Sequence, residues 1–212
     1  MAVHRILKWP SAKLRLKSKR VDDFEFAVEL AKNCFDTMKA NLGVGVAAPQ
    51  IGFNLRLLVV DSSHLPSLKP CDKIQGSCVL VNPVLTPASD ETFKWEEACL
   101  SVDDTQATVE RYSNINLVYE DLNKQRHELQ LTDREAGVIQ HEADHLDGRL
   151  FIDRLPAFER RRVLKKLKRK NAEKLKDRRE RNRNRLAEAK KVKARKARKK
   201  TKKTFGKNKR RK

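Results

Sequence analysis

The charge of this chain is divided so unevenly that only its first part can build a hydrophobic core. From residue 160 to residue 212 there are 30 Lys and Arg against 4 Asp and Glu, a net charge of +26. The first 159 residues hold the other 19 basic and 24 acidic side chains, a net charge of −5. A segment of about 155 residues is long enough to bury a core. We therefore predict a folded domain over residues 1–155 and a basic extension over residues 156–212.

The order of helix-like and strand-like patterns predicts the class of this domain. Apolar residues recur at helical spacing between residues 21 and 43, with Asp22 or Asp23 in the capping position. A second helix is predicted over about residues 133–147, where Thr132 and Glu135 form a capping-box pattern and Gly148 follows the last turn. Extended segments are predicted from apolar or alternating runs at 55–61, 78–85, 93–102, 114–121 and 126–131, the last two as a hairpin. Strands followed by a buried helix indicate an α+β domain.

The sequence QHEADHLDG, residues 140–148, lies within the second predicted helix. His141 and His145 are four residues apart, so both imidazoles project from one helix face and can reach one divalent ion. Glu142 is then placed beside the ion, where a carboxylate can accept a proton from an activated water. Two surface histidines beside a chance glutamate are the simpler alternative for this stretch alone.

A catalytic metal of this kind needs a third protein ligand. The longer metalloprotease pattern fits as far as Gly148, but its third histidine would fall at Phe151, which cannot bind metal. The next glutamate downstream is Glu159, which we expect to lie outside the domain. The candidates that spacing leaves open are upstream: His4, His64, His127 and the four cysteines Cys34, Cys71, Cys78 and Cys99.

Three motifs together resemble a known family. They are GVGVAAPQ at 43–50, EACLS at 97–101 and QHEADHLDG at 140–148. In this order they resemble the signature motifs of the peptide deformylases, which run roughly G-x-G-x-A-A-x-Q, E-G-C-L-S and H-E-x-D-H. The first and third match at every defining position, and the second departs at Ala98, where the family has glycine. With ILKWPSAKLR near the start, the similarity spans about residues 5–155.

The resemblance implies a fold and a set of site residues. The fold would be small antiparallel sheets around a central metal-binding helix. The metal ligands would be Cys99, His141 and His145, and the ion is usually Fe2+, although Zn2+, Ni2+ and Co2+ accept the same ligands. Glu142 would act as acid and base, while the Gln50 side chain and the Leu100 backbone N–H would stabilise the oxyanion. Substrate contacts are expected from Val44, Gly45, Trp95, Glu97 and Gly137.

The resemblance also implies the reaction: removal of the N-formyl group from the formyl-methionine of nascent polypeptides. Ala98 matters here, because an alanine is unfavourable if the family's glycine has a positive φ or lets substrate approach closely, and harmless if its φ is ordinary. An RNA-bound pseudoenzyme on the same scaffold is therefore kept as the alternative. A metalloprotease and a simple RNA-binding protein are the remaining ones.

Two pairs of residues raise questions about the predicted site. Trp95 and Gly137 are both expected on the metal-facing side, and a glycine within a helix costs about 1 kcal/mol relative to alanine. We predict that Gly137 leaves space that the Trp95 indole partly fills; close packing of helix and strand is the alternative. Asp144 would need a partner if buried, and Arg111 is the expected one; a solvent-facing Asp144 is the alternative.

The basic extension predicts a polyanionic partner. A long helix is favoured from Pro156 onward, and disorder is expected in the low-complexity sequence from Val192. Dense Lys and Arg neutralise phosphates and release counterions, and the resemblance makes ribosomal RNA the leading partner. Non-specific RNA or DNA binding and a passive tail are the alternatives. Residues expected to contact it include Arg160, Arg161, Arg162, Lys165, Lys166, Lys168, Arg169 and Lys170.

The absence of an apolar run of membrane-spanning length bears on location. We expect no membrane span, a monomer in the cytoplasm, and four reduced cysteines. The basic, acid-poor start of the chain leaves a mitochondrial or plastid matrix as the alternative.

Overall fold

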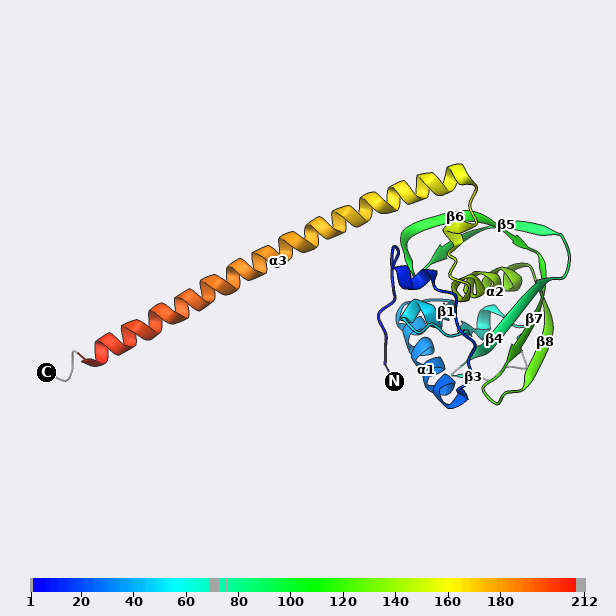
Figure 1. Ribbon diagram of the computed structural model, residues 1–212, viewed down its shortest axis with the longest axis horizontal. Helices are drawn as coiled ribbons and strands as arrows, with labels where there is room; N and C mark the ends of the chain where they lie inside the picture. Colours follow the sequence, from blue (N-terminus) through cyan, green and yellow to red (C-terminus); the bar gives the residue numbers. More distant parts are fainter. Residues whose placement is uncertain (1, 69–72, 75, 209–212) are drawn as a thin grey trace. The chain divides into compact units, whose positions relative to one another are not determined.

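The computed structural model describes residues 2–68, 73–74 and 76–208 (Figure 1). These residues include three α-helices and eight strands. The helices are α1 (Phe24–Ala40), α2 (Asp133–Leu146) and α3 (Ala157–Asn208). The strands are β1 (Gly45–Ala47), β2 (Leu57–Asp61), β3 (Lys73–Ile74), β4 (Ser77–Pro87), β5 (Thr92–Cys99), β6 (Val102–Tyr112), β7 (Asn114–Glu120) and β8 (Arg126–Thr132).

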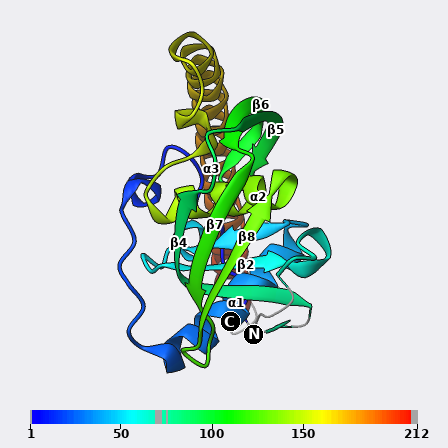
Figure 2. The same ribbon diagram turned by 90° about the vertical axis from the view of Figure 1, so that its right-hand side faces the viewer.

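All named strand pairs are antiparallel and form two sheets. The larger has the order β1-β2-β4-β7-β8, with β3 paired to β4. The smaller is the ribbon of β5 and β6. Helix α2 contacts strands of both sheets, and Figures 1 and 2 show it lying between them. The α+β class and the central position of the predicted metal-binding helix are confirmed.

Burial of both faces explains why β2 is apolar at every position from Leu57 to Val60. Leu57 and Val59 belong to the core cluster that contains the buried face of α1. Leu58 and Val60 belong to the cluster that contains residues of α2. All four side chains are fully buried. A strand covered on both faces is apolar at every position.

Helix α2 begins and ends close to the predicted residues, but its first turn differs. Thr132 occupies the N-cap position without a side-chain capping hydrogen bond. Glu135 instead accepts a hydrogen bond from the backbone N–H of Ser67, at 3.0 Å, so the predicted capping box is wrong. The Glu135 carboxylate makes this tertiary contact with Ser67 in place of a local capping bond. Gly148 follows the helix with φ +69°, and a Cβ there would lie 2.5 Å from the Arg15 carbonyl oxygen, so only glycine fits.

Strand β6 was missed in the sequence. The predicted segment 93–102 is divided: β5 ends at Cys99 and β6 begins at Val102 after a short turn. The buried side chains of β6 are Val102, Thr105, Val109 and Arg111. Two of the four are polar, so the apolar alternation that identifies a strand is too weak to recognise.

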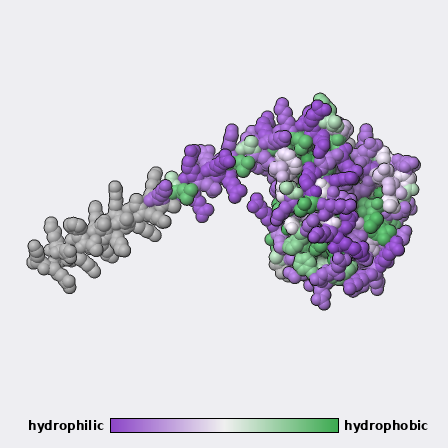
Figure 3. Space-filling model, viewed as in Figure 1, coloured by the Kyte–Doolittle hydropathy of each residue, from purple (hydrophilic) through white to green (hydrophobic). Residues whose placement is uncertain are grey.

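The chain divides into two compact units, Met1–Arg160 and Arg161–Lys212. Helix α3 continues to Asn208, through a segment expected to be disordered. Lys, Arg and Ala are good helix formers, which accounts for the difference. The described surface of this helix is strongly hydrophilic (Figure 3). Among the described residues, no helix combines the length and apolar character needed to cross a bilayer.

The cysteines depart from the expectation of four reduced thiols. Cys34 and Cys99 are free and buried, whereas Cys78 is disulfide-bonded. Cys71 lies outside the described residues. Sequence spacing alone does not reveal which cysteines a fold brings within bonding distance.

Candidate metal centre

Three donor side chains from separate parts of the sequence meet at one point. Cys99 ends β5, and His141 and His145 lie one turn apart on α2. One ligand atom from each lies within 4.8 Å of those of the other two. The Sγ atom of Cys99 is 3.3 Å from Nε2 of His145. The structure thus brings together the three residues named as ligands, and does so with the spacing that a shared ion requires.

Among the described residues, none of the three upstream histidine candidates, His4, His64 and His127, joins this cluster. His127 pairs with Asp121, at 2.9 Å between Nε2 and Oδ2. His4 lies edge-on against Phe53, with 5.5 Å between the ring centroids. In the described part of the chain, neither of these histidines belongs to a group that could hold a metal ion.

Glu97 orients one of the histidines. Nδ1 of His141 donates to Oε2 of Glu97 at 2.6 Å, which leaves Nε2 free to face a metal. A carboxylate behind a ligating histidine fixes the ring and its tautomer. Glu97 therefore lies behind the site, which differs from the substrate contact expected in the sequence. Its oxygens also accept hydrogen bonds from Trp95 Nε1 at 2.8 Å and from Arg111 Nε at 2.8 Å.

The electrostatics of the site favour an ionised Glu97 and a thiolate at Cys99. Burial opposes ionisation of Glu97, but hydrogen bonds from His141 and Arg111 lower its pKa to about 2. Burial likewise opposes the Cys99 thiolate, but the charge of His145 and hydrogen bonds from both histidines hold its pKa well below the ordinary value. One thiolate and two imidazoles suit divalent iron, zinc and related ions. The residues present therefore fit a metal ion.

Glu142 is positioned beside the ligands by a glycine. Its side chain is buried, and a Cβ at position 45 would lie 2.6 Å from its Oε1. Only glycine at position 45 therefore leaves the carboxylate where it is. Burial raises the pKa of Glu142, against the opposing charges of His141 and His145. Among the described residues its buried Oε2 has no hydrogen-bond partner.

The Gln50 amide is fixed with its nitrogen toward the ligands. Oε1 accepts a hydrogen bond from the Ala47 N–H at 2.8 Å. The opposite end, Nε2, lies 3.7 Å from the Sγ of Cys99 and donates to Ser101 Oγ at 3.3 Å. The amide thus offers an N–H donor on the metal side.

The N-terminal segment hydrogen-bonds to the two segments that carry the expected oxyanion donors, one at Gln50 and one at Leu100–Ser101. The Leu7 N–H donates to the Gln50 carbonyl at 2.7 Å. Two residues on, the Trp9 N–H donates to the Ser101 carbonyl at 2.8 Å. Lys8 Nζ donates to the Leu100 carbonyl at 2.6 Å. These contacts were not predicted, since no local pattern signals pairing between segments so far apart in the chain.

Trp95 lies against Gly137, a contact that fits both the predicted pocket role and its alternative, close packing of helix and strand. A Cβ at Gly137 would be 3.0 Å from Cε2 and Cζ2 of Trp95 and 3.1 Å from Cζ of Phe93. The indole thus fills the space that a side chain on α2 would take. Val44, in the first motif, is half-buried and packs against the same core cluster as Trp95.

Ala98 fits its position without strain. In the described residues, the non-glycine positions with positive φ are Leu42, Asn82, Asp104, Lys124 and Asp133. Ala98 is not among them, and its side chain is exposed. Ordinary backbone geometry therefore accommodates the departure from the family's glycine.

This α+β domain, with a thiolate and two imidazoles beside a buried carboxylate, defines a metal-dependent hydrolase. The family model described as polypeptide deformylase matches residues 3–161. The chain belongs to that family, and it is an enzyme of the formate-releasing, amide-hydrolysing class.

Individual proteins show the same relationship. The peptide deformylase of Bartonella tribocorum is 37% identical over 175 residues, which cover 82% of this chain and 96% of that protein. A crystal structure of a peptide deformylase from Legionella pneumophila has a TM-score of 0.70 at 34% identity, covering 82% of this chain and 98% of that one. A Met-Ala-Ser-bound class I type b peptide deformylase from Acinetobacter baumannii has a TM-score of 0.64 at 32% identity, covering 73% and 99%.

Proposed function

We propose that this protein removes the formyl group from the N-terminal formyl-methionine of nascent polypeptides. The observation that carries the proposal is the meeting of Cys99, His141 and His145 beside the buried Glu142. The Met-Ala-Ser bound to the Acinetobacter baumannii relative is the tripeptide that deformylation of formyl-Met-Ala-Ser would leave. Release of formate from that peptide is the direct test.

Each step of the reaction has a residue able to perform it. A divalent ion held by the three ligands would polarise the formyl carbonyl and lower the pKa of a water. Glu142 is placed to take the proton of the attacking water and to return it to the leaving amine. The Gln50 amide and the Leu100 N–H donate to the developing oxyanion; one such donor is worth about a hundredfold or more in rate.

For the metal in the cell we propose Fe2+. Zn2+, Ni2+ and Co2+ fit the same donor set, because thiolate and imidazole ligands accept all four ions. The family and the Cys-His-His cluster support a divalent ion. Metal analysis of protein purified from its own cells, without oxygen, distinguishes these ions.

The geometry of β1 suggests how a peptide binds. β1 lies at one edge of the larger sheet in the described residues, so an extended peptide can pair with it beside Val44 and Gly45. Its first side chain would then enter the region of Trp95 and Gly137. The proposed substrate contacts of Val44, Gly45, Trp95 and Gly137 are inferred from their positions near the metal cluster.

The pair of Gly137 and Trp95 predicts a change in side-chain preference. In a Gly137→Ile variant the new Cβ would lie 3.0 Å from the Trp95 indole, and the branched side chain extends further, so the indole must shift. We expect kcat/KM for formyl-Met peptides to fall more than that for formyl-peptides with a smaller first residue. The same relative preference among formyl-Met, formyl-Leu and formyl-Phe peptides in both proteins would contradict a pocket role. Formate release with each peptide is the measurement.

We further propose that the basic extension binds ribosomal RNA. Its support is the charge of +26 over residues 160–212 and the hydrophilic surface of the described part of α3 (Figure 3). We also propose a domain over residues 1–155 with an extension over residues 156–212, a monomeric state and a cytoplasmic location. A pseudoenzyme is not favoured, since Ala98 has ordinary geometry and the ligands and Glu142 are all present.

Salt dependence tests the proposed RNA contact. If about six or more phosphates are neutralised, affinity should fall about a thousandfold between about 50 mM and about 200 mM salt. Glutamine at five tail positions should weaken binding and flatten the salt dependence; a matched control neutralises five exposed lysines of the first unit. An equal effect of both variants would contradict a specific role of the tail. The tail positions are Lys165, Lys166, Lys168, Arg169 and Lys170, and the control positions are Lys13, Lys17, Lys19, Lys32 and Lys94.

A further inference from the structure

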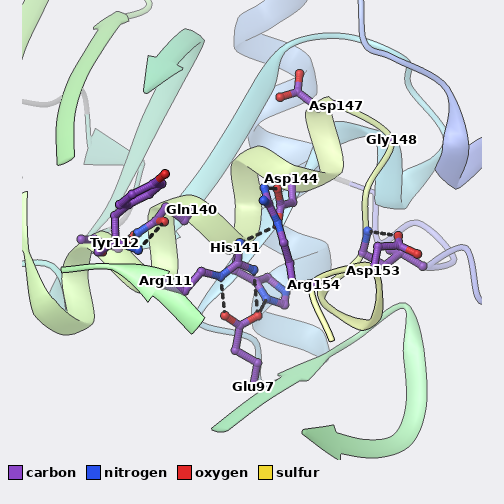
Figure 4. Close-up of polar contacts among 12 residues, drawn as sticks. Glu97, Arg111, Tyr112, Gln140, His141, Asp144, Asp147, Gly148, Asp153 and Arg154 are labelled. Atoms are coloured by element: carbon purple, nitrogen blue, oxygen red, sulfur yellow. Dashed lines mark hydrogen bonds and ion pairs between the residues drawn. The ribbon is translucent and has the colours of Figure 1, made fainter. Parts of the chain in front are cut away.

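A chain of alternating charges runs from a metal ligand to the end of the catalytic unit (Figure 4). It begins at His141, whose Nδ1 donates to Glu97. Arg111 links Glu97 to Asp144, with NH1 of Arg111 2.6 Å from Oδ2 of Asp144. Arg154 completes the chain from the far side of Asp144. The predicted pairing of Arg111 with Asp144 is confirmed, whereas the contact of Arg154 had no signal in the sequence.

The middle of this chain is enclosed by protein. The side chains of Glu97, Arg111 and Asp144 are 1%, 2% and 5% exposed. Two carboxylates therefore share one buried guanidinium, and a buried charge without a partner is costly. Arg154 supplies the second positive charge that the pair of carboxylates lacks.

Arg154 meets Asp144 with a fork of two hydrogen bonds. Its Nε is 3.1 Å from Oδ2, and its second donor, NH2, is 2.5 Å from Oδ1. Such two-point contacts fix orientation as well as charge, which a lysine cannot reproduce. Asp144 lies on α2 one position before His145 and three after His141. Arg154 therefore fixes a carboxylate located between the two metal ligands.

We infer that Arg154 is a positioning residue for the metal centre, acting on His141 through Asp144, Arg111 and Glu97. The inference rests on the proposed metal-dependent function. With Arg154 in place, Asp144 accepts hydrogen bonds from both Arg154 and Arg111. Arg111 can then keep two of its N–H donors on Glu97. Without it, Asp144 competes for Arg111, and Glu97 holds the His141 ring less firmly.

The test is the affinity of the full-length protein for Co2+, measured by competition with a chelator and by the thiolate absorption of the complex. Arg154→Gln should weaken Co2+ binding by about tenfold, the lower end of the effect of losing a partner behind a ligating histidine. Arg154→Lys should recover only part of the loss, because it restores charge without the fork. The melting temperature of the metal-free protein is measured alongside.

Arg15→Gln is the matched control. Arg15 pairs with Asp153, the residue next to Arg154, and does not contact Asp144. Its side chain is 38% exposed, against 39% for Arg154. Co2+ affinity should be unchanged in this variant. Equal losses in both variants would mean general loosening of this segment and would overturn the inference, as would unchanged affinity in both.

A double-mutant cycle identifies the route. In an Asp144→Asn background, Arg154→Gln should have little further effect on Co2+ affinity, because the carboxylate through which it acts is gone. A full tenfold additional loss there would overturn the proposed route. Failure of the unsubstituted protein to bind Co2+ would contradict the proposed metal site itself, so the two failures are distinguishable.

Discussion

Replacement of Cys99 by alanine is expected to abolish stoichiometric binding of a divalent metal and, with it, formate release. Cys99 supplies the one sulfur in the cluster of described residues that can hold an ion. Its pKa is held well below the ordinary value, against burial, by the charge of His145 and the hydrogen bonds of both histidines. The ligand is therefore a thiolate, and alanine leaves two imidazoles that bind an ion far more weakly.

Metal content and turnover are measured on the same preparation. Cys34→Ala is the matched control, because Cys34 is also free and buried but packs in the core cluster around α1. This control should keep its metal and its activity. Full metal binding and turnover in Cys99→Ala would show that the ion is held elsewhere.

Replacement of Glu142 by alanine is expected to separate metal binding from turnover. The carboxylate is placed beside the ligands by Gly45, and one of its oxygens has no hydrogen-bond partner in the described part of the chain. A positioned acid or base contributes about a hundredfold to ten-thousandfold in rate. The rate of formate release should therefore fall by at least about a hundredfold, while the metal remains bound.

Glu135→Gln provides the comparison for this second prediction. Glu135 lies in the first turn of the same helix and accepts a hydrogen bond from Ser67, which a glutamine oxygen can also accept. Its activity should stay near that of the unsubstituted protein. Turnover that persists in Glu142→Ala at the normal rate would remove Glu142 from the mechanism.

Local patterns were sufficient to predict the parts of the fold that carry a strong periodic signal. The start pattern at Thr132 and Glu135 and the stop at Gly148 predicted helix α2, and the four-residue spacing of His141 and His145 placed both ligands on one face. The apolar run of β2 indicated a strand covered on both faces. The three motifs then related Cys99 to the histidines, which spacing alone could not do.

Apart from the pairing of Arg111 with Asp144, long-range polar contacts could not be predicted in this way. Arg154 and Lys8 lie in segments with no distinctive pattern, and their roles depend on which buried carboxylate or carbonyl the fold brings near them. Glu97 was assigned to the substrate because strand alternation shows the side to which a residue points but not what occupies the space there. The absent capping box at Thr132 has the same cause: a tertiary partner took the Glu135 carboxylate.

The most direct test is release of formate from formyl-Met-Ala-Ser by protein purified without oxygen and loaded with iron(II) or nickel(II). We expect turnover that depends on the added metal and disappears in Glu142→Ala. Stoichiometric metal binding without any turnover would contradict the proposed function, and would identify the protein as a family member that has lost its chemistry.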